Sequence, residues 1–190
     1  LAGYQFRNIS ETYPNSEFTK EAYYKSAYCS YLESPRPSLD QSSTHRAIEE
    51  FQLFIRKYPQ DEKVGQCNNY IAELRDKLEE KAYKAARFYF DLGDYKAASV
   101  ALRNALRKYP DTDYRESLLY LTFKSDFLLA ENSVKSKKAQ RYEKAIKAYY
   151  PLMDEFPETE HKKEVKKMFS EAQESLKAIQ RKQDKPLSVN

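Results

Sequence analysis

The sequence predicts an all-α protein: a right-handed α-solenoid of about eight helices in antiparallel pairs, with no sheet. Composition is the first observation, because only three Gly occur among 190 residues while the strong helix formers Ala, Leu, Lys and Glu are abundant. The second is one helix-ending phrase that occurs four times. Measured between Tyr13, Tyr58, Tyr109 and Phe156, the copies are 45, 51 and 47 residues apart. Repeats of this size are typical of stacked helix pairs, which serve as binding surfaces more often than as catalysts.

Each position of the phrase has a physical role. Its residues recur at offsets of 0, 4, 7 and 11 from an alanine, so they lie on one helical face and form a packing stripe. The last residue is aromatic and precedes a proline, which lacks an N–H and moves the residue before it out of the helical conformation. The copies are Ala2/Phe6/Ile9/Tyr13-Pro14, Ala47/Phe51/Phe54/Tyr58-Pro59, Ala98/Leu102/Ala105/Tyr109-Pro110 and Ala145/Tyr149/Leu152/Phe156-Pro157.

A residue with a side-chain oxygen follows each of these prolines by two positions. The four are Ser16, Asp61, Thr112 and Thr159. We expect each to be the N-cap of the next helix, because such side chains accept a hydrogen bond from a free helix N–H. With these stops and starts, the expected helices cover residues 1–13, 16–33, 44–58, 61–92, 94–109, 112–131, 139–156 and 159–182.

The repeat pattern extends over residues 1–182, which we expect to form a single repeat domain, with residues 183–190 as a frayed tail. Ala2 already lies in the phrase that marks the second helix of a pair. We therefore expect the first helix of that pair upstream of Leu1, together with any export signal or lipid anchor.

The residues give no support for catalysis, and we expect neither an enzyme nor a cofactor. His45 and His161 are far apart in the sequence and each lies near a helix start, so solvated or capping roles are expected and not metal ligation. Pairs such as Glu49/Glu50 lie in amphipathic helices and are interpreted as solvent-facing charge. Phosphate-binding loops and nucleophile motifs do not occur. The net charge of +4 comes from interspersed charges, with no stripe for nucleic acid.

The segment from Ala82 to Pro110 resembles one tetratricopeptide repeat. Tyr89 lies in its first helix, and Gly93 opens a Gly-Asp-Tyr turn before the stripe that starts at Ala98. The intervals exceed the roughly 34-residue tetratricopeptide period because of the loops 34–43 and 131–140 and the long helix 61–92. The structural repeat positions are Ala47, Phe51, Tyr58, Pro59, Tyr89, Gly93, Ala98, Tyr109, Pro110, Ala145, Phe156 and Pro157.

Residues 74–112 carry a more specific resemblance, on Leu74-Arg75-Asp76-Lys77-Leu78, Gly93 and Leu106–Thr112. They are similar to the BamD family, the tetratricopeptide lipoproteins of the outer-membrane β-barrel assembly machinery, and the order of elements fits over residues 1–180. The resemblance implies a scaffold on the periplasmic face of the cell outer membrane, held there by an N-terminal lipid anchor. It also implies that the carboxy-terminal repeats dock on the barrel subunit BamA and that the amino-terminal repeats contact unfolded barrel substrates. Nucleic acid is not an implied partner.

Two features of the BamD family are missing from this sequence. The lipidated cysteine is absent, because Cys29 lies within a repeat helix, and the position of a basic residue that can meet BamA holds Ala101. The nearby basic candidates for that contact are Arg103, Arg107 and Lys108. Tyr24 and Tyr28 are candidates for a substrate groove, with packing between helices as the alternative.

Three other functions remain open from the sequence. One is a generic tetratricopeptide adaptor that binds peptide termini, and another is the regulatory domain of a larger enzyme. A weaker third is nucleic-acid binding through Lys135–Lys138 and Lys162–Lys167.

Overall fold

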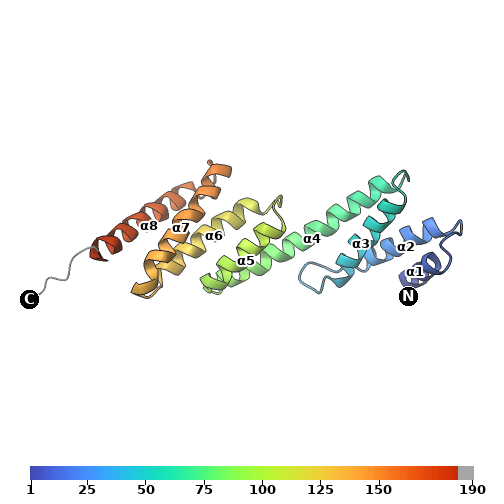
Figure 1. Ribbon diagram of the computed structural model, residues 1–190, viewed down its shortest axis with the longest axis horizontal. Helices are drawn as coiled ribbons and strands as arrows, with labels where there is room; N and C mark the ends of the chain where they lie inside the picture. The colour runs from blue at the N-terminus through green and yellow to red at the C-terminus, as the bar shows by residue number, and fades with distance from the viewer. Residues whose placement is uncertain (184–190) are drawn as a thin grey trace, which may run out of the picture. The chain divides into compact units, whose positions relative to one another are not determined.

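A computed structural model describes residues 1–183, and the regular structure within them is helical (Figure 1). The helices are α1 (Ala2–Thr12), α2 (Thr19–Leu32), α3 (Ser42–Lys57), α4 (Val64–Asp91), α5 (Tyr95–Lys108), α6 (Arg115–Glu131), α7 (Lys135–Glu155) and α8 (Lys162–Gln183). Across these residues there are eight helices and no strand, so the predicted all-α class is confirmed.

The chain divides into two compact units, with the boundary inside α4. Unit 1 comprises Leu1–Lys81 and unit 2 begins at Ala82. In unit 1, α2 packs against α1 and α3; in unit 2, α6 packs against α5 and α7, and α7 packs against α8. Each of these helices therefore packs mainly on its neighbours in sequence, as in helical repeat proteins. The single domain expected over residues 1–182 stays a prediction, and the expected tail lies outside the described residues apart from Gln183.

The aromatic–proline step ends four helices with one geometry. The residue before proline has φ between −124° and −131° and ψ between 60° and 74° at Tyr13, Tyr58, Tyr109 and Phe156. Its N–H still donates to the carbonyl four residues earlier, at 2.8–3.0 Å, and its own carbonyl accepts the N–H three residues onward, at 3.1–3.4 Å. Because proline cannot continue the helix, the chain turns at the same place in each copy.

The expected N-caps lie inside this turn. Their side-chain oxygens accept the N–H two residues onward at 3.3, 2.9, 3.3 and 3.3 Å in Ser16, Asp61, Thr112 and Thr159. The regular helices begin three residues after each of these, at Thr19, Val64, Arg115 and Lys162. The N-cap prediction is therefore wrong. One further turn, closed by a backbone bond of 3.0–3.1 Å to the carbonyl of each expected cap, precedes the helix.

Apolar side chains form one cluster in each unit. In unit 1, Phe51 and Phe54 of α3 are at most 1% exposed and pack with Leu74 of α4. In unit 2, Leu102 of α5 and Leu152 of α7 are fully buried. Burial of one such side chain stabilises the fold by about 1.5–3 kcal/mol. The packing stripe is thus confirmed in the second, third and fourth copies.

The first copy of the stripe buries less of its surface. Ile9 of α1 and Tyr13, which follows its end, are 38% and 63% exposed. Gly3 of the same helix lies close to α2, because a Cβ built there would meet the Cβ of Cys29 at 3.0 Å. The contact between α1 and α2 therefore includes a close approach of small residues, while Ile9 and Tyr13 remain exposed.

Gly93 ends α4 in a left-handed conformation with φ of +77°. Its N–H donates to the carbonyl of Phe90 at 2.9 Å, and the next N–H, of Asp94, donates to Tyr89 at 3.1 Å. This pair of bonds is the Schellman arrangement, in which glycine avoids the strain that a Cβ brings. The Asp94 carboxylate then accepts the Ala97 N–H at 3.0 Å and caps α5.

Gly93→Ala is expected to lower the free energy of unfolding by about 1 kcal/mol, because alanine is strained at positive φ. No atom lies within 4 Å of the added Cβ, so backbone strain is the only cost. The matched control is Gly65→Ala inside α4, where the added Cβ is equally free and the backbone is helical. Thermal or urea denaturation should show the control unchanged or slightly stabilised. Equal stability of the two variants would contradict the assignment of Gly93.

Candidate partner-binding surfaces

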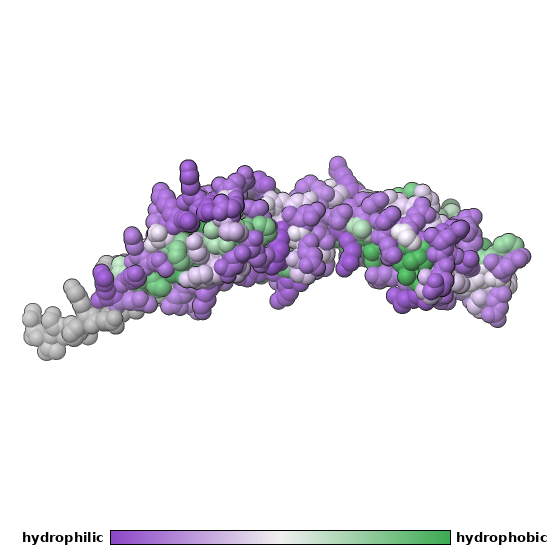
Figure 2. Space-filling view, turned by 90° about the horizontal axis from the view of Figure 1, so that it is seen from above, coloured by the Kyte–Doolittle hydropathy of each residue, from purple (hydrophilic) through white to green (hydrophobic). Residues whose placement is uncertain are grey.

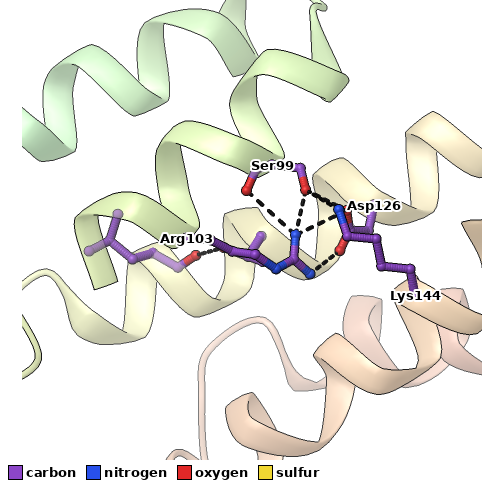
Figure 3. Close-up of polar contacts among 6 residues, drawn as sticks. Ser99, Arg103, Asp126 and Lys144 are labelled. Atoms are coloured by element: carbon purple, nitrogen blue, oxygen red, sulfur yellow. Dashed lines mark hydrogen bonds and ion pairs between the residues drawn. The ribbon is translucent and has the colours of Figure 1, made fainter. Parts of the chain in front are cut away.

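A buried carboxylate joins three helices of unit 2 (Figure 3). Asp126 of α6 is 1% exposed and forms ion pairs with Arg103 of α5 and Lys144 of α7. The Ser99 hydroxyl donates to Asp126 Oδ1 at 2.6 Å, and Lys144 Nζ lies 3.2 Å from the same oxygen. Arg103 also donates to the hydroxyl oxygen of Ser99 at 2.5 Å. A buried charge needs such partners, because an unpaired carboxylate is costly away from water.

We call the cluster of Ser99, Arg103, Asp126 and Lys144 a polar joint. Its two cations are only partly enclosed by the protein. The side chains of Arg103 and Lys144 are 36% and 46% exposed, and together they exceed the charge of Asp126 by one. The structure therefore gives Arg103, predicted from its position as a partner contact, a structural role between helices. The predicted contact itself stays a prediction.

Unit 1 has a similar joint, in which the arginine occupies the same repeat position. Arg7 follows Ala2 of the first copy by five residues, as Arg103 follows Ala98 of the third. Arg7 forms an ion pair with Glu50 of α3, and the Ser30 hydroxyl of α2 donates to Glu50 at 2.9 Å. In each joint, one carboxylate accepts from an arginine and from a serine hydroxyl, and the residues come from three consecutive helices.

The helix that supplies the carboxylate differs between the two joints. Ser30 and Asp126 both lie sixteen residues after the proline of the preceding copy, whereas Glu50 corresponds to Ala148. Sequence reasoning missed Ser99, Asp126 and Lys144 as a network. The signal available was one aspartate inside the apolar run 118–130 of the sequence, where a charge demands a partner.

Arg107 and Lys108 lie at the exposed end of α5. Arg107 donates to the side-chain oxygen of Asn104 at 2.8 Å, and Lys108 Nζ lies 5.2 Å from the Tyr109 ring centroid. Within residues 1–183, neither takes part in an ion pair. Of the three basic candidates, these two are the most accessible to a partner.

The predicted Tyr24 and Tyr28 lie in an aromatic cluster of unit 1. Their rings stack at 6.2 Å and 5°, and Tyr24 also meets Phe54 edge-on at 5.7 Å. Tyr28 lies 5.6 Å from Tyr70 of α4. The two rings are half-buried, so their faces are used for packing between α2, α3 and α4. The Tyr24 hydroxyl donates to Gln66 at 3.0 Å.

Two tyrosine hydroxyls in this cluster are hard to ionise. The pKa of Tyr31 is raised to about 12, first because its hydroxyl donates to Glu73 at 2.6 Å and then by burial. The pKa of Tyr24 is also raised to about 12, with burial as the main cause. Both groups therefore stay neutral and remain hydrogen-bond donors well above neutral pH.

A polar groove of about 730 Å³ lies between α1 and α3 of unit 1, with α2 beneath it. The Arg7–Glu50 pair crosses it and the buried Ser10 and Ser26 form part of its floor. Its lining is Arg7, Ser10, Glu11, Tyr23, Ser26, Ser42, His45, Arg46, Glu49, Glu50, Leu53 and Arg56. The groove carries both signs of charge, and sequence analysis did not identify it because its walls come from three helices.

The described residues hold no group of three or more His, Cys, Asp or Glu placed to bind a metal. His45 is exposed at the groove, whereas His161 stacks on Tyr120 of α6 at 3.7 Å and 10°, so it is a packing residue and not a solvated one.

Among the helices of residues 1–183, none has both the length and the apolar composition needed to cross a bilayer. The face shown in Figure 2 is mainly hydrophilic, with apolar side chains in separate patches.

Stacked helix pairs with polar joints and accessible charged faces define a helical-repeat protein. A comparison with family models identifies the family. The model of the YfiO family, described as an outer membrane lipoprotein, matches residues 8–141. The match spans more than half of the sequence, so this chain belongs to the YfiO family of outer membrane lipoproteins. BamD is a member of this family, which consists of non-catalytic scaffold proteins. The predicted outer-membrane association is confirmed at this level.

The two cations around Asp126 are expected to be coupled. Arg103→Gln and Lys144→Gln each leave the buried carboxylate one cationic partner, whereas the double variant leaves it only the Ser99 hydroxyl. The double variant should lose at least about 1 kcal/mol more free energy of unfolding than the two single variants combined. Urea denaturation measures all three, and Arg107→Gln, which removes an exposed cation of α5, should change stability by less than about 0.5 kcal/mol. If the stability losses of the two single variants simply add up in the double variant, the proposed coupling of Arg103 and Lys144 through Asp126 is wrong.

Tyr31 is expected to titrate well above the usual range of a tyrosine, and so is Tyr24. An unfolded tyrosine ionises near pH 10, and the folded pKa is raised to about 12. The stability linked to Tyr31 is therefore complete below pH 10 and is lost as the pH rises towards about 12. Titration followed by ultraviolet absorbance measures the ionisation of the tyrosine hydroxyls. The Tyr31→Phe variant identifies which part of the absorbance change belongs to Tyr31. Glu73→Gln should lower the pKa of Tyr31 and leave that of Tyr24; an unchanged Tyr31 would contradict the role of Glu73.

Proposed function

We propose that this chain is a BamD-like scaffold subunit of the outer-membrane β-barrel assembly machinery. It acts at the periplasmic face of the outer membrane, docks on a BamA-like barrel subunit and assists insertion of β-barrel proteins. The observation that carries the proposal is the family match over residues 8–141. The all-helical fold supports it, because stacked helix pairs offer long surfaces for protein partners.

The docking surface proposed for the barrel subunit is the end of α5 in unit 2. Arg107 and Lys108 are exposed there, one helical turn beyond the partly exposed Arg103 of the buried joint. Because the joint fixes α5 against α6 and α7, these cations are presented from a rigid base. Charged groups at the rim of an interface increase the association rate and select a partner of opposite charge.

The surface proposed for unfolded barrel substrates is the tyrosine cluster of unit 1. Tyr24 and Tyr28 are only half-buried, while their ring faces are held by packing. Rigid tyrosines combine apolar contact with a hydrogen-bonding group at little entropic cost. An extended substrate strand can use both the apolar contact and the hydrogen bond, whatever its own sequence.

Arg107→Glu combined with Lys108→Glu is expected to reduce recovery of the barrel subunit from solubilised outer membrane at least about tenfold, which corresponds to about 1.4 kcal/mol of binding free energy. The charge reversal replaces attraction by repulsion at the α5 end. The matched control reverses two exposed charges of unit 1 that lie outside the groove, Arg36→Glu and Arg75→Glu, and should leave recovery unchanged. Recovery is measured by affinity purification of the tagged chain.

Two outcomes count against the proposal in different ways. Equal recovery with both double variants would remove the α5 end as the docking surface. Failure of the unaltered chain to recover any barrel subunit would remove the assembly function itself. A preference for short peptide termini would then favour a generic adaptor.

A further inference from the structure

The outward face of α8 carries a row of basic residues. Val165, Met168 and Ala172 on the inner face are 0%, 7% and 0% exposed and belong to the core of unit 2. The outer face carries the α8 stripe, which comprises Lys163, Lys166, Lys167, Lys177 and Arg181, all exposed. Their spacing of i, i+3, i+4, i+14 and i+18 places them on one side of the helix over about 27 Å.

Internal ion pairs leave most of this stripe uncompensated. Lys167 lies 3.9 Å from Glu171 and its side chain is 77% exposed, so that pair is weak. Within residues 1–183, no ion pair engages Lys163, Lys166 or Lys177. Glu171 and Glu174 are the exposed acidic residues on or beside this face. The helix therefore presents a surplus of positive charge to the solvent.

The surplus is a property of unit 2 as a whole. From Ala82 onward the sequence contains 22 of the 33 Lys and Arg residues and 16 of the 29 Asp and Glu residues. Before Ala82 there are 11 basic and 13 acidic residues. The modest net charge of the chain thus conceals a basic unit and a slightly acidic one. An anionic surface would attract unit 2 and not unit 1.

We propose that the α8 stripe lies on anionic phospholipid headgroups. Membership in a family of outer membrane lipoproteins means that the anchored chain is held beside a bilayer. The apolar face of α8 is buried in its own unit, so the helix rests on the headgroups and does not insert. Each Lys or Arg held near an anionic bilayer raises partitioning about fivefold. The contact adds to a lipid anchor and does not depend on the barrel subunit.

The residue types of the stripe favour a bilayer over nucleic acid. Four of its five members are lysines, which act as point charges on flexible stems, whereas recognition of base edges in nucleic acids favours the bidentate guanidinium. Sites for single strands also combine basic groups with aromatic platforms. The α8 stripe includes no aromatic residue.

The test is flotation of the 190-residue chain with phosphatidylcholine vesicles, with and without phosphatidylglycerol. We expect binding only to the anionic vesicles, and release when the ionic strength is raised. The variant Lys163→Gln, Lys166→Gln, Lys177→Gln and Arg181→Gln should lower the partition coefficient at least about a hundredfold. The matched control removes four exposed charges from α5 and α7, with Lys96→Gln, Lys135→Gln, Lys137→Gln and Lys147→Gln, and should lower it less than about tenfold.

Thermal melts establish that both variants are folded, since all eight substitutions are at exposed positions. Equal loss in the two variants would show that net charge and not the stripe is responsible, which overturns the proposal. Binding to uncharged vesicles, or binding of duplex DNA as tight as that of anionic vesicles and lost in the same variant, would also overturn it. Recovery of the barrel subunit by the stripe variant is expected to be normal, so failure here is distinct from failure of the assembly function.

Discussion

Each repeat of this chain depends on the position at which one helix is made to stop. The aromatic–proline step fixes that position, because the proline removes one N–H and the aromatic residue adopts nearly the same φ and ψ each time. The next helix then starts at a constant distance in sequence. Ser30 and Asp126 consequently reach equivalent joints although they lie in different units. Packing stripes and polar joints both follow from this backbone constraint.

The helices could be predicted because their signals are local. Proline positions and the spacing of apolar residues determine where a helix runs, and the observed boundaries lie within four residues of the expected ones. The starts after each proline were placed three residues too early. A side-chain oxygen that accepts a nearby N–H occurs both at a helix N-cap and in a turn. The residue types at Ser16 and Thr112 therefore do not distinguish an N-cap from the turn that the structure has there.

The candidate sites were harder to predict because they depend on which helix faces meet. Arg103 was identified by its position, but its partners Asp126 and Lys144 come from two other helices. The ring faces of Tyr24 and Tyr28 are used for packing, which the sequence left open as an alternative. Asp126 was the informative residue, since a charge within an apolar run implies a partner elsewhere in the chain. The identity of that partner requires the packing of α5, α6 and α7.

The two joints have a consequence for how such repeats diverge. Both joints keep one negative charge among three helices. The third of the three helices supplies it in unit 1 (α3), and the second supplies it in unit 2 (α6). A column-by-column alignment scores Ser30 against Asp126 and Glu50 against Ala148 as two mismatches, although together they are one compensated exchange. Similarity between repeats measured by residue identity therefore understates how much of their physical design is shared. A comparison of where charges lie in space would recover it.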